Sequence, residues 1–237
     1  MKFLALVTAR GGSKGVSRKN VKLLGGKPLI WYTYQSAKES SLFSEIVLST
    51  EDDEIAAIGK MIGFDVPFKR PEYLASDVSK SIDVVNHALD TMDKLGHKYD
   101  AVVLLQPTSP FREKGLIKRS VQKFIDSHAD SLVSVRKVPH QFNPHWVFEP
   151  NDDGYLKIAT SDKTLISRRQ DLPEAYFRDG QVYISSVNLI KNHNTFLGER
   201  LTYVVNSYCG SEVNIDNLSD WDKAENFIEQ HNSLSNE

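Results

Sequence analysis

Phe3-Leu4-Ala5-Leu6-Val7-Thr8-Ala9-Arg10-Gly11-Gly12-Ser13-Lys14-Gly15 is the stretch that decides the fold. Its first five residues are all apolar, which is typical of a strand buried on both faces in the middle of a parallel sheet. Glycines follow almost at once, so the strand ends in a turn. In an open α/β sheet the ligand site lies at the carboxyl ends of the strands. The stretch therefore predicts both a central strand and the position of the site.

Further along the chain, short apolar runs alternate with amphipathic segments. The pattern predicts strands at 46–49, 65–68, 101–105 and 132–135, and helices at 29–40, 51–62, 81–95 and 116–125. Strands at 181–184 and 203–205 and a helix at 219–231 follow. Such alternation predicts an α/β fold in which helices cover a mostly parallel sheet.

Residues 139–175 interrupt this alternation. Turn signals such as Asn151-Asp152-Asp153-Gly154 recur there around short hydrophobic pieces. A chain of 237 residues fits one domain, 1–237, with this stretch as an insertion.

Composition and charge narrow the classes of function. The formal net charge is −2 and the basic residues are dispersed, which disfavours nucleic acid or a membrane surface as the partner. No apolar run reaches about 18 residues and no signal-peptide pattern is present, so we expect neither a membrane span nor export. The only cysteine, Cys209, excludes an internal disulfide and fits the reducing cytoplasm.

The loop after the first strand has a high density of positive charge. Its cations are Arg10, Lys14, Arg18 and Lys19. The backbone of a glycine-rich loop can approach phosphate oxygens closely while such cations neutralise them. The loop is not a Walker A loop, because Gly15 follows Lys14, nor a dinucleotide fingerprint, because Arg10 takes the first glycine position. The alternative interpretation is a solvated basic turn.

The segment from Ala9 through Lys19-Asn20 resembles the signature of acylneuraminate cytidylyltransferases, the CMP-sialic acid synthetases. Further matches follow in the same order: Arg70-Pro71-Glu72 with Leu74-Ala75-Ser76-Asp77, Leu105 to Arg112, Arg169-Gln170 with Leu172-Pro173, and Gly180 with Tyr183-Ile184. The resemblance spans nearly the whole chain. It implies a three-layer Rossmann-like nucleotidyltransferase fold, Mg²⁺ as cofactor, and a homodimer in which 139–175 is the dimerisation and sugar-side arm.

The implied reaction transfers CMP from CTP to the anomeric hydroxyl of a sialic-acid-like 2-keto sugar acid and releases pyrophosphate. The resemblance implies Lys19, Arg10 and Asp216 as catalytic residues. The implied nucleotide-binding residues are Arg10, Gly11, Gly12, Ser13, Lys19, Asn20, Arg70, Ser79 and Ser81. Positioned cations fit this chemistry, since they stabilise the charge that develops during transfer at phosphorus. Taken alone, Arg70-Pro71 is typical of an ordinary turn.

On the sugar side, the resemblance implies Gln106, Arg169, Gln170 and Tyr183. A guanidinium such as that of Arg169 suits a carboxylate, although Arg168-Arg169 is also compatible with a surface pair. Tyr183 fits either the sugar's acyl group or the core. Phe177 stands where the family has a second arginine, with Arg178 beside it, and Arg112 is expected to be structural.

The implied metal residues are Asp216 and Asn214, which match the family's Asp-x-Asp site in part. As residues i and i+2 of a strand, they would face the same side and offer two oxygens to one hard cation. A helix-capping aspartate before Ser219 is the alternative for Asp216.

Two other functions stay open. The departures at Phe177 and Asn214 leave room for the same chemistry on pseudaminic, legionaminic or an eight-carbon keto-acid sugar. A nucleotide-sensing homologue without turnover is the second alternative.

Overall fold

The computed structural model describes residues 1–234. The chain divides into two compact units, Met1–Ser134 with Asp179–Glu237 and, separately, Val135–Arg178. The second unit contains the predicted insertion at 139–175 together with a few residues on either side.

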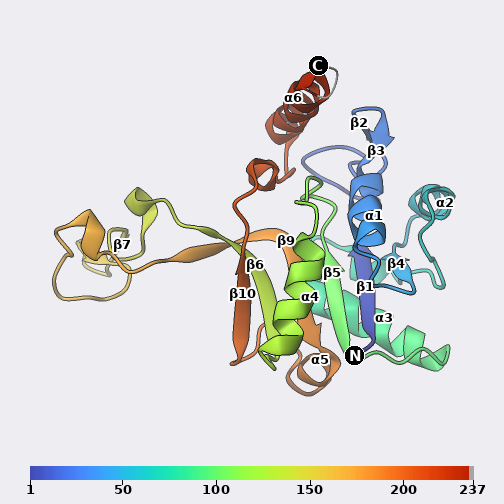
Figure 1. Ribbon diagram of the computed structural model, residues 1–237, viewed down its shortest axis with the longest axis horizontal. Helices are drawn as coiled ribbons and strands as arrows, with labels where there is room; N and C mark the ends of the chain where they lie inside the picture. Colours follow the sequence, from blue (N-terminus) through green and yellow to red (C-terminus); the bar gives the residue numbers. More distant parts are fainter. Residues whose placement is uncertain (235–237) are drawn as a thin grey trace. The chain divides into compact units, whose positions relative to one another are not determined.

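A six-stranded sheet forms the centre of the first unit (Figure 1). Its order is β10 (Leu201–Val205), β6 (Ser131–Lys137), β9 (Tyr176–Ser186), β5 (Ala101–Leu105), β1 (Phe3–Thr8) and β4 (Ile46–Ser49). β1 pairs in parallel with both β4 and β5, whereas β9 is antiparallel to β5. The mostly parallel α/β sheet and the inner position of the first strand are therefore confirmed.

Helices cover both faces of this sheet. α1 (Leu29–Ser40), α2 (Asp53–Ile62) and α4 (Leu116–Asp126) contribute to one hydrophobic cluster, and α3 (Ser81–Lys94) and α5 (Val187–His193) to another. β1 divides its side chains between the two clusters, Phe3, Ala5 and Val7 on one face and Leu4 and Leu6 on the other. Its continuous apolar run thus has the predicted cause, burial on both sides.

A third cluster joins the C-terminal helix to the start of the chain. α6 (Leu218–Leu234) packs through Trp221 and Ala224 against Leu24 and Leu29, close to the hairpin of β2 (Leu23–Leu24) and β3 (Lys27–Pro28). Ile215, which precedes the helix, belongs to the same cluster. The C-terminal helix therefore packs against residues that lie in and just after the loop at 9–20, among them Val16.

One local prediction was wrong, and one helix was not predicted. The expected strand at 65–68 is a single parallel bridge between Val47 and Asp65. Pro67 has no N–H to donate, so the ladder does not continue past it. The prediction also missed α5, a helix of seven residues whose length gives little periodic signal.

The second unit has little regular structure. β7 (Phe148–Pro150) and β8 (Leu156–Ile158) form an antiparallel hairpin, and η2 (His140–Phe142) and η3 (Arg169–Asp171) are single 3₁₀ turns. Buried Asn143 donates from Nδ2 to the Pro173 carbonyl at 2.9 Å, which holds the two ends of the unit together. Within residues 1–234, every helix is too short or too polar to traverse a bilayer.

Candidate active site

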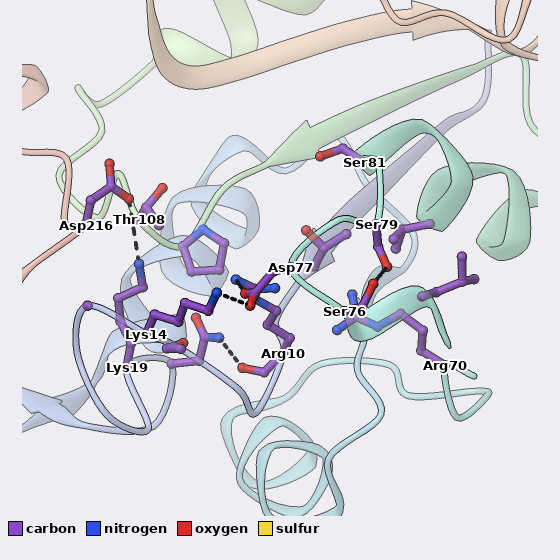
Figure 2. Close-up of a pocket in the computed structure, with 17 residues that line it drawn as sticks. Arg10, Lys14, Lys19, Arg70, Ser76, Asp77, Ser79, Ser81, Thr108 and Asp216 are labelled. Carbon is purple, nitrogen blue, oxygen red and sulfur yellow. Dashed lines mark hydrogen bonds and ion pairs between the residues drawn. The ribbon is translucent and has the colours of Figure 1, made fainter. Parts of the chain in front are cut away.

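A cavity of about 440 Å³ lies beside the loop that follows β1 (Figure 2). Three other segments complete its wall: the stretch from Arg70 to α3, the residues that follow β5, and the segment before α6. Its lining comprises Thr8, Arg10, Ser13, Lys14, Gly15, Lys19, Asn20, Arg70, Leu74, Ser76, Asp77, Ser79, Ser81, Val84, Pro107, Thr108 and Asp216. The site is at the carboxyl edge of the parallel strands, as expected for this class of fold.

Most of the predicted nucleotide-binding residues meet in this cavity. They are Arg10, Ser13, Lys19, Asn20, Arg70, Ser79 and Ser81. Gly11 and Gly12 belong to the same loop but are not part of the lining. The roles assigned to these residues stay predictions, and the structure brings seven of them to one place.

Two contacts with backbone atoms hold the loop in its position. Asn20 is buried and donates from Nδ2 to the Arg10 carbonyl at 2.9 Å, which closes the loop at its base. A Cβ built on Gly15 would overlap the Asp216 carbonyl oxygen and lie 2.9 Å from its carbonyl carbon. Only glycine therefore allows the loop to pack against the segment before α6.

One of the four loop cations points elsewhere. Arg18 donates from Nη1 and Nη2 to the two carboxylate oxygens of Asp52, at 2.6 and 2.9 Å, and also pairs with Glu54. These bonds lower the pKa of Asp52 to about 2. The expectation that Arg18 adds to the phosphate-facing charge is thus wrong, because the acidic start of α2 holds its guanidinium.

Lys19 is the most enclosed lysine of the cavity, with a side chain 13% exposed. Its Nζ donates to the Ile215 carbonyl at 2.7 Å and lies 3.8 Å from Oδ1 of Asp216. Burial lowers the pKa of Lys19, and the Asp216 carboxylate opposes that shift in part. The structure therefore positions one cation, by two contacts, next to the predicted metal residue.

Arg10 and Lys14 share a carboxylate that the sequence did not single out. Asp77 accepts from Nη2 of Arg10 at 2.9 Å and from Nζ of Lys14 at 2.6 Å (Figure 2). These two contacts, with Lys14 the larger influence, lower the pKa of Asp77. Asp77 thus forms ion pairs with two cations that the sequence analysis places at or near the phosphates.

Arg70 forms the deepest charged contact of the site. It is 4% exposed, donates from Nη2 to the Ala9 carbonyl at 3.2 Å and forms an ion pair with Glu51. The other carboxylate oxygen of Glu51 accepts from the Gly11 N–H at 2.7 Å. Sequence reasoning missed Glu51, although an acidic residue just after a buried strand is a signal for a site at that edge.

The segment from 72 to 81 forms the opposite wall. η1 (Glu72–Ala75) leads into a turn in which Ser79 Oγ donates to the Tyr73 carbonyl at 2.9 Å and contacts Ser76 Oγ at 2.7 Å. α3 then begins at Ser81 without a side-chain cap. The positive end of its dipole is therefore directed to the cavity that Ser81 lines.

Asn214 and Asp216 lie in an irregular segment before α6, and the expected strand there is absent among the described residues. Their side chains still face each other, with Nδ2 of Asn214 donating to Oδ2 of Asp216 at 2.8 Å. Asn217 caps α6 by accepting from the Asp220 N–H at 3.1 Å, so the capping interpretation of Asp216 is wrong. The Asp216 side chain is 67% exposed and available to a ligand.

Within residues 1–234, no group of three or more His, Cys, Asp or Glu side chains is arranged to hold a metal ion. A hard cation at Asp216 would therefore need oxygens from water and phosphate to complete its coordination. Mg²⁺ commonly binds in this way, through one or two carboxylates plus substrate phosphates. The residues present fit that mode of binding.

The predicted sugar-side residues belong to both units. Gln106 and Tyr183 lie in the first unit, and both are half-buried. Gln106 directly precedes Pro107 and Thr108 of the cavity, whereas Tyr183 packs against the cluster of α3 and α5. Arg112 donates from Nη2 to the Gln106 carbonyl at 2.6 Å and from Nε to the Gln181 carbonyl at 2.9 Å, which confirms its structural role.

Arg169 and Gln170 are exposed residues of η3 in the second unit. Arg169 lines a cavity of about 390 Å³ with Lys137, His140, Asn143 and residues 172–175. Phe177 faces the guanidinium of Arg136, whose Cζ is 6.0 Å from the ring centre, and Arg178 is exposed. The Phe177 position thus carries a cation–π contact in this chain.

Three relatives of known type are similar in sequence. A CMP-N,N'-diacetyllegionaminic acid synthase of Legionella pneumophila is 34% identical over 229 residues, 97% of each chain. A pseudaminic acid cytidylyltransferase of Campylobacter jejuni is 33% identical over 186 residues, 78% of this chain and 79% of the relative. An N-acylneuraminate cytidylyltransferase of Escherichia coli is 30% identical over 224 residues, 94% of this chain and 51% of that protein.

The fold is also similar to a solved structure of a CMP:2-keto-3-deoxy-manno-octonic acid synthetase complexed with CTP. The TM-score is 0.71 at 15% identity, over 98% of this chain and 100% of that chain. The profile of the family described as cytidylyltransferase matches residues 4–237. This chain belongs to the cytidylyltransferase family and is a nucleotidyltransferase.

Proposed function

We propose that this protein transfers CMP from CTP to the anomeric hydroxyl of a 2-keto sugar acid of the sialic type, with release of pyrophosphate. The anomeric oxygen forms a bond to the α-phosphorus, the bond from that phosphorus to the bridging oxygen breaks, and the hydroxyl proton passes to solvent. One observation carries this proposal. In a member of the cytidylyltransferase family, a single cavity holds Arg10, Lys14, Lys19, Arg70 and Asp216.

The charge arrangement supports this chemistry. Arg10, Lys14 and the enclosed Lys19 place positive charge where a triphosphate would lie, and preorganised charge of this kind stabilises a phosphoryl-transfer transition state. Asp216, with Asn214, would hold Mg²⁺, which when bound neutralises phosphate charge. Lys19 and Asp216 lie next to each other in the cavity. A protein that only senses a nucleotide does not require this pair, so the pair favours catalysis.

The class of sugar follows from the relatives. Their names specify legionaminic, pseudaminic and N-acylneuraminic acids, all of them acidic sugars, while the structural neighbour's name specifies an octonic acid. Arg169 suits the acid group that such sugars share. Phe177 stands where the family resemblance implies a second arginine. We therefore expect a substrate whose substituents differ from those that such an arginine would bind.

We also propose a homodimer in a reducing cytoplasm. Large apolar side chains of the second unit are exposed, and they are Phe142, Phe148, Tyr155, Leu156, Leu165 and Phe177. A subunit interface would cover exposed apolar side chains of this kind. The single cysteine, which is exposed and unbridged, fits the compartment. Light scattering coupled to gel filtration tests the dimer, and a monomer at micromolar concentration would contradict it.

The decisive experiment measures pyrophosphate release for each of the four nucleoside triphosphates against a panel of keto-sugar acids. The panel holds N-acylneuraminic, legionaminic, pseudaminic and eight-carbon acids. We expect release with CTP and at least one nine-carbon acid, and dependence on Mg²⁺. Release only with the eight-carbon acid would replace the sugar class, and no release with any pair would overturn the enzyme function.

A further inference from the structure

Three chain segments meet behind the wall of the cavity. β1 and β4 run in parallel with Thr8 opposite Ser49, so the residues that follow them leave the sheet side by side. The Ala9 N–H donates to the Ser49 carbonyl at 3.1 Å, and the Arg70 N–H donates to the Thr50 carbonyl at 2.9 Å. The phosphate loop, the start of α2 and the segment at Arg70 thus lie in contact at one point.

Glu51 joins these segments through its side chain. Oε1 accepts from the Gly11 N–H at 2.7 Å, and Oε2 pairs with Nη2 of Arg70. The same Nη2 donates to the Ala9 carbonyl at 3.2 Å. The contacts form a closed ring from Ala9 through Arg70 and Glu51 to Gly11, two residues further along the loop.

Burial makes this ring hard for water to replace. The side chains of Arg70 and Glu51 are 4% and 14% exposed. Removal of one partner from a buried ion pair leaves the other charge uncompensated, which is far more disruptive than the loss of a surface pair. Each of the two segments is therefore held in position by the other.

An acidic residue just before a helix often serves as its N-cap, but in α2 this role belongs to Asp52 and not to Glu51. Asp52 is the cap of α2 and accepts from the Ile55 N–H at 2.9 Å, so Glu51 is not needed to start the helix. Glu51 is also outside the lining of the cavity, whereas Arg70 is part of it. Among the described residues, its carboxylate contacts the site through Gly11 and Arg70.

We infer that Glu51 is a positioning residue for the nucleotide, which fixes the phosphate loop and the Arg70 guanidinium in one mutual arrangement. The inference deepens the proposed function and rests on it for the identity of the nucleotide. A preorganised site binds more tightly because less ordering is required on binding. Lys19 is held separately by the Ile215 carbonyl, whereas Glu51 contacts Gly11 and Arg70. The effect of Glu51 therefore belongs to CTP binding and not to the sugar or to the chemical step.

The test is Glu51→Gln, which keeps the size of the side chain but turns one acceptor into an N–H₂ group that faces a guanidinium. Loss of a charge-assisted hydrogen bond predicts a Kd for CTP raised about tenfold or more by calorimetry. The KM for the sugar acid and kcat at saturating CTP stay within about threefold. Glu54→Gln is the matched control, since it removes an exposed carboxylate that pairs with Arg18 at the same helix start.

A second measurement does not depend on the nucleotide. Hydrogen exchange of the free protein should show faster exchange in residues 9–20 for Glu51→Gln than for Glu54→Gln. If Glu51→Gln does not fold, Glu51→Asp replaces it, because the aspartate keeps the charge but is too short to reach both partners, and we expect a smaller rise in Kd. Unchanged CTP affinity in the folded variant, or an equal fall in kcat and rise in both KM values, would overturn the inference while the proposed function stands. Absence of turnover in the unmodified protein with loop protection lost in Glu51→Gln would overturn the proposed function alone.

Discussion

Replacement of Gly15 by alanine tests whether the phosphate loop and the Asp216 segment form one rigid site. The new Cβ would lie 2.9 Å from the Asp216 carbonyl carbon and 3.3 Å from Cα of Asn217, and it would overlap the carbonyl oxygen. Carbon atoms in contact are about 3.5 Å apart, and the oxygen overlap is larger, so the segments must separate by roughly 1 Å. All three nearest atoms belong to the backbone, so rotation of a side chain cannot relieve the clash.

That separation acts where Lys19 is held. Lys19 bonds to the carbonyl of Ile215, one residue before the point of the clash. A misplacement of about 1 Å in a catalytic arrangement costs on the order of 100-fold in rate, so we expect kcat/KM of Gly15→Ala to fall by about that factor. The assay is CTP-dependent pyrophosphate release over a titration of CTP and Mg²⁺.

Gly12→Ala is the steric control, because a Cβ at Gly12 meets no atom within 4 Å. The melting temperature should match that of the unmodified protein for Gly12→Ala and fall for Gly15→Ala. Wild-type kcat/KM in Gly15→Ala would refute the close packing of loop and Asp216 segment, and with it the argument that the two act together.

Other perturbations address single charges of the cavity. Lys19→Ala should lower kcat by about 10²-fold or more, because an enclosed donor acts chiefly in the transition state, and unchanged turnover would remove Lys19 from the mechanism. Burial lowers the pKa of Lys19, so its ammonium group loses its proton at a lower pH than an ordinary lysine does. On the alkaline side, kcat/KM should therefore begin to fall at a lower pH, and Lys19→Arg should move this fall to a higher pH. Asp216→Asn should shift the Mg²⁺ titration to higher concentration, and an unaltered titration would contradict the metal assignment. Asp77→Asn frees Arg10 and Lys14 from a competing carboxylate, so the Kd for CTP should fall about two- to fivefold, whereas weaker binding would show that Asp77 helps to orient Arg10.

Much of the sheet could be predicted because burial on both faces leaves a continuous apolar run. Phe3–Thr8 and Ala101–Leu105 are such strands, and both lie where the pattern puts them. The direction of β9 could not be predicted, since a long excursion separates it from β6 and a run of side chains carries no sign of orientation. Pro67 was a readable signal against a full strand at 65–68.

The site shows the same limits. The cation density of residues 9–20 pointed to the cavity, but the composition of a loop does not say which way each side chain turns. Arg18 has a positive φ of 53° and reaches Asp52, a partner 34 residues away. Glu51 was missed, and Asp77 was given no role although it belongs to the second matching segment. Their partners come from other segments, and only the fold brings them together.

The contact between Lys19 and the Ile215 carbonyl joins residues 196 positions apart. A ribosome adds about 5 to 20 residues per second, so the loop emerges roughly 10 to 40 s before the carbonyl that holds its lysine. A nascent chain that has not reached Ile215 has the basic loop but no anchor for Lys19 and no Asp216. Competence for catalysis thus waits until the segment of Ile215 and Asp216 has been translated.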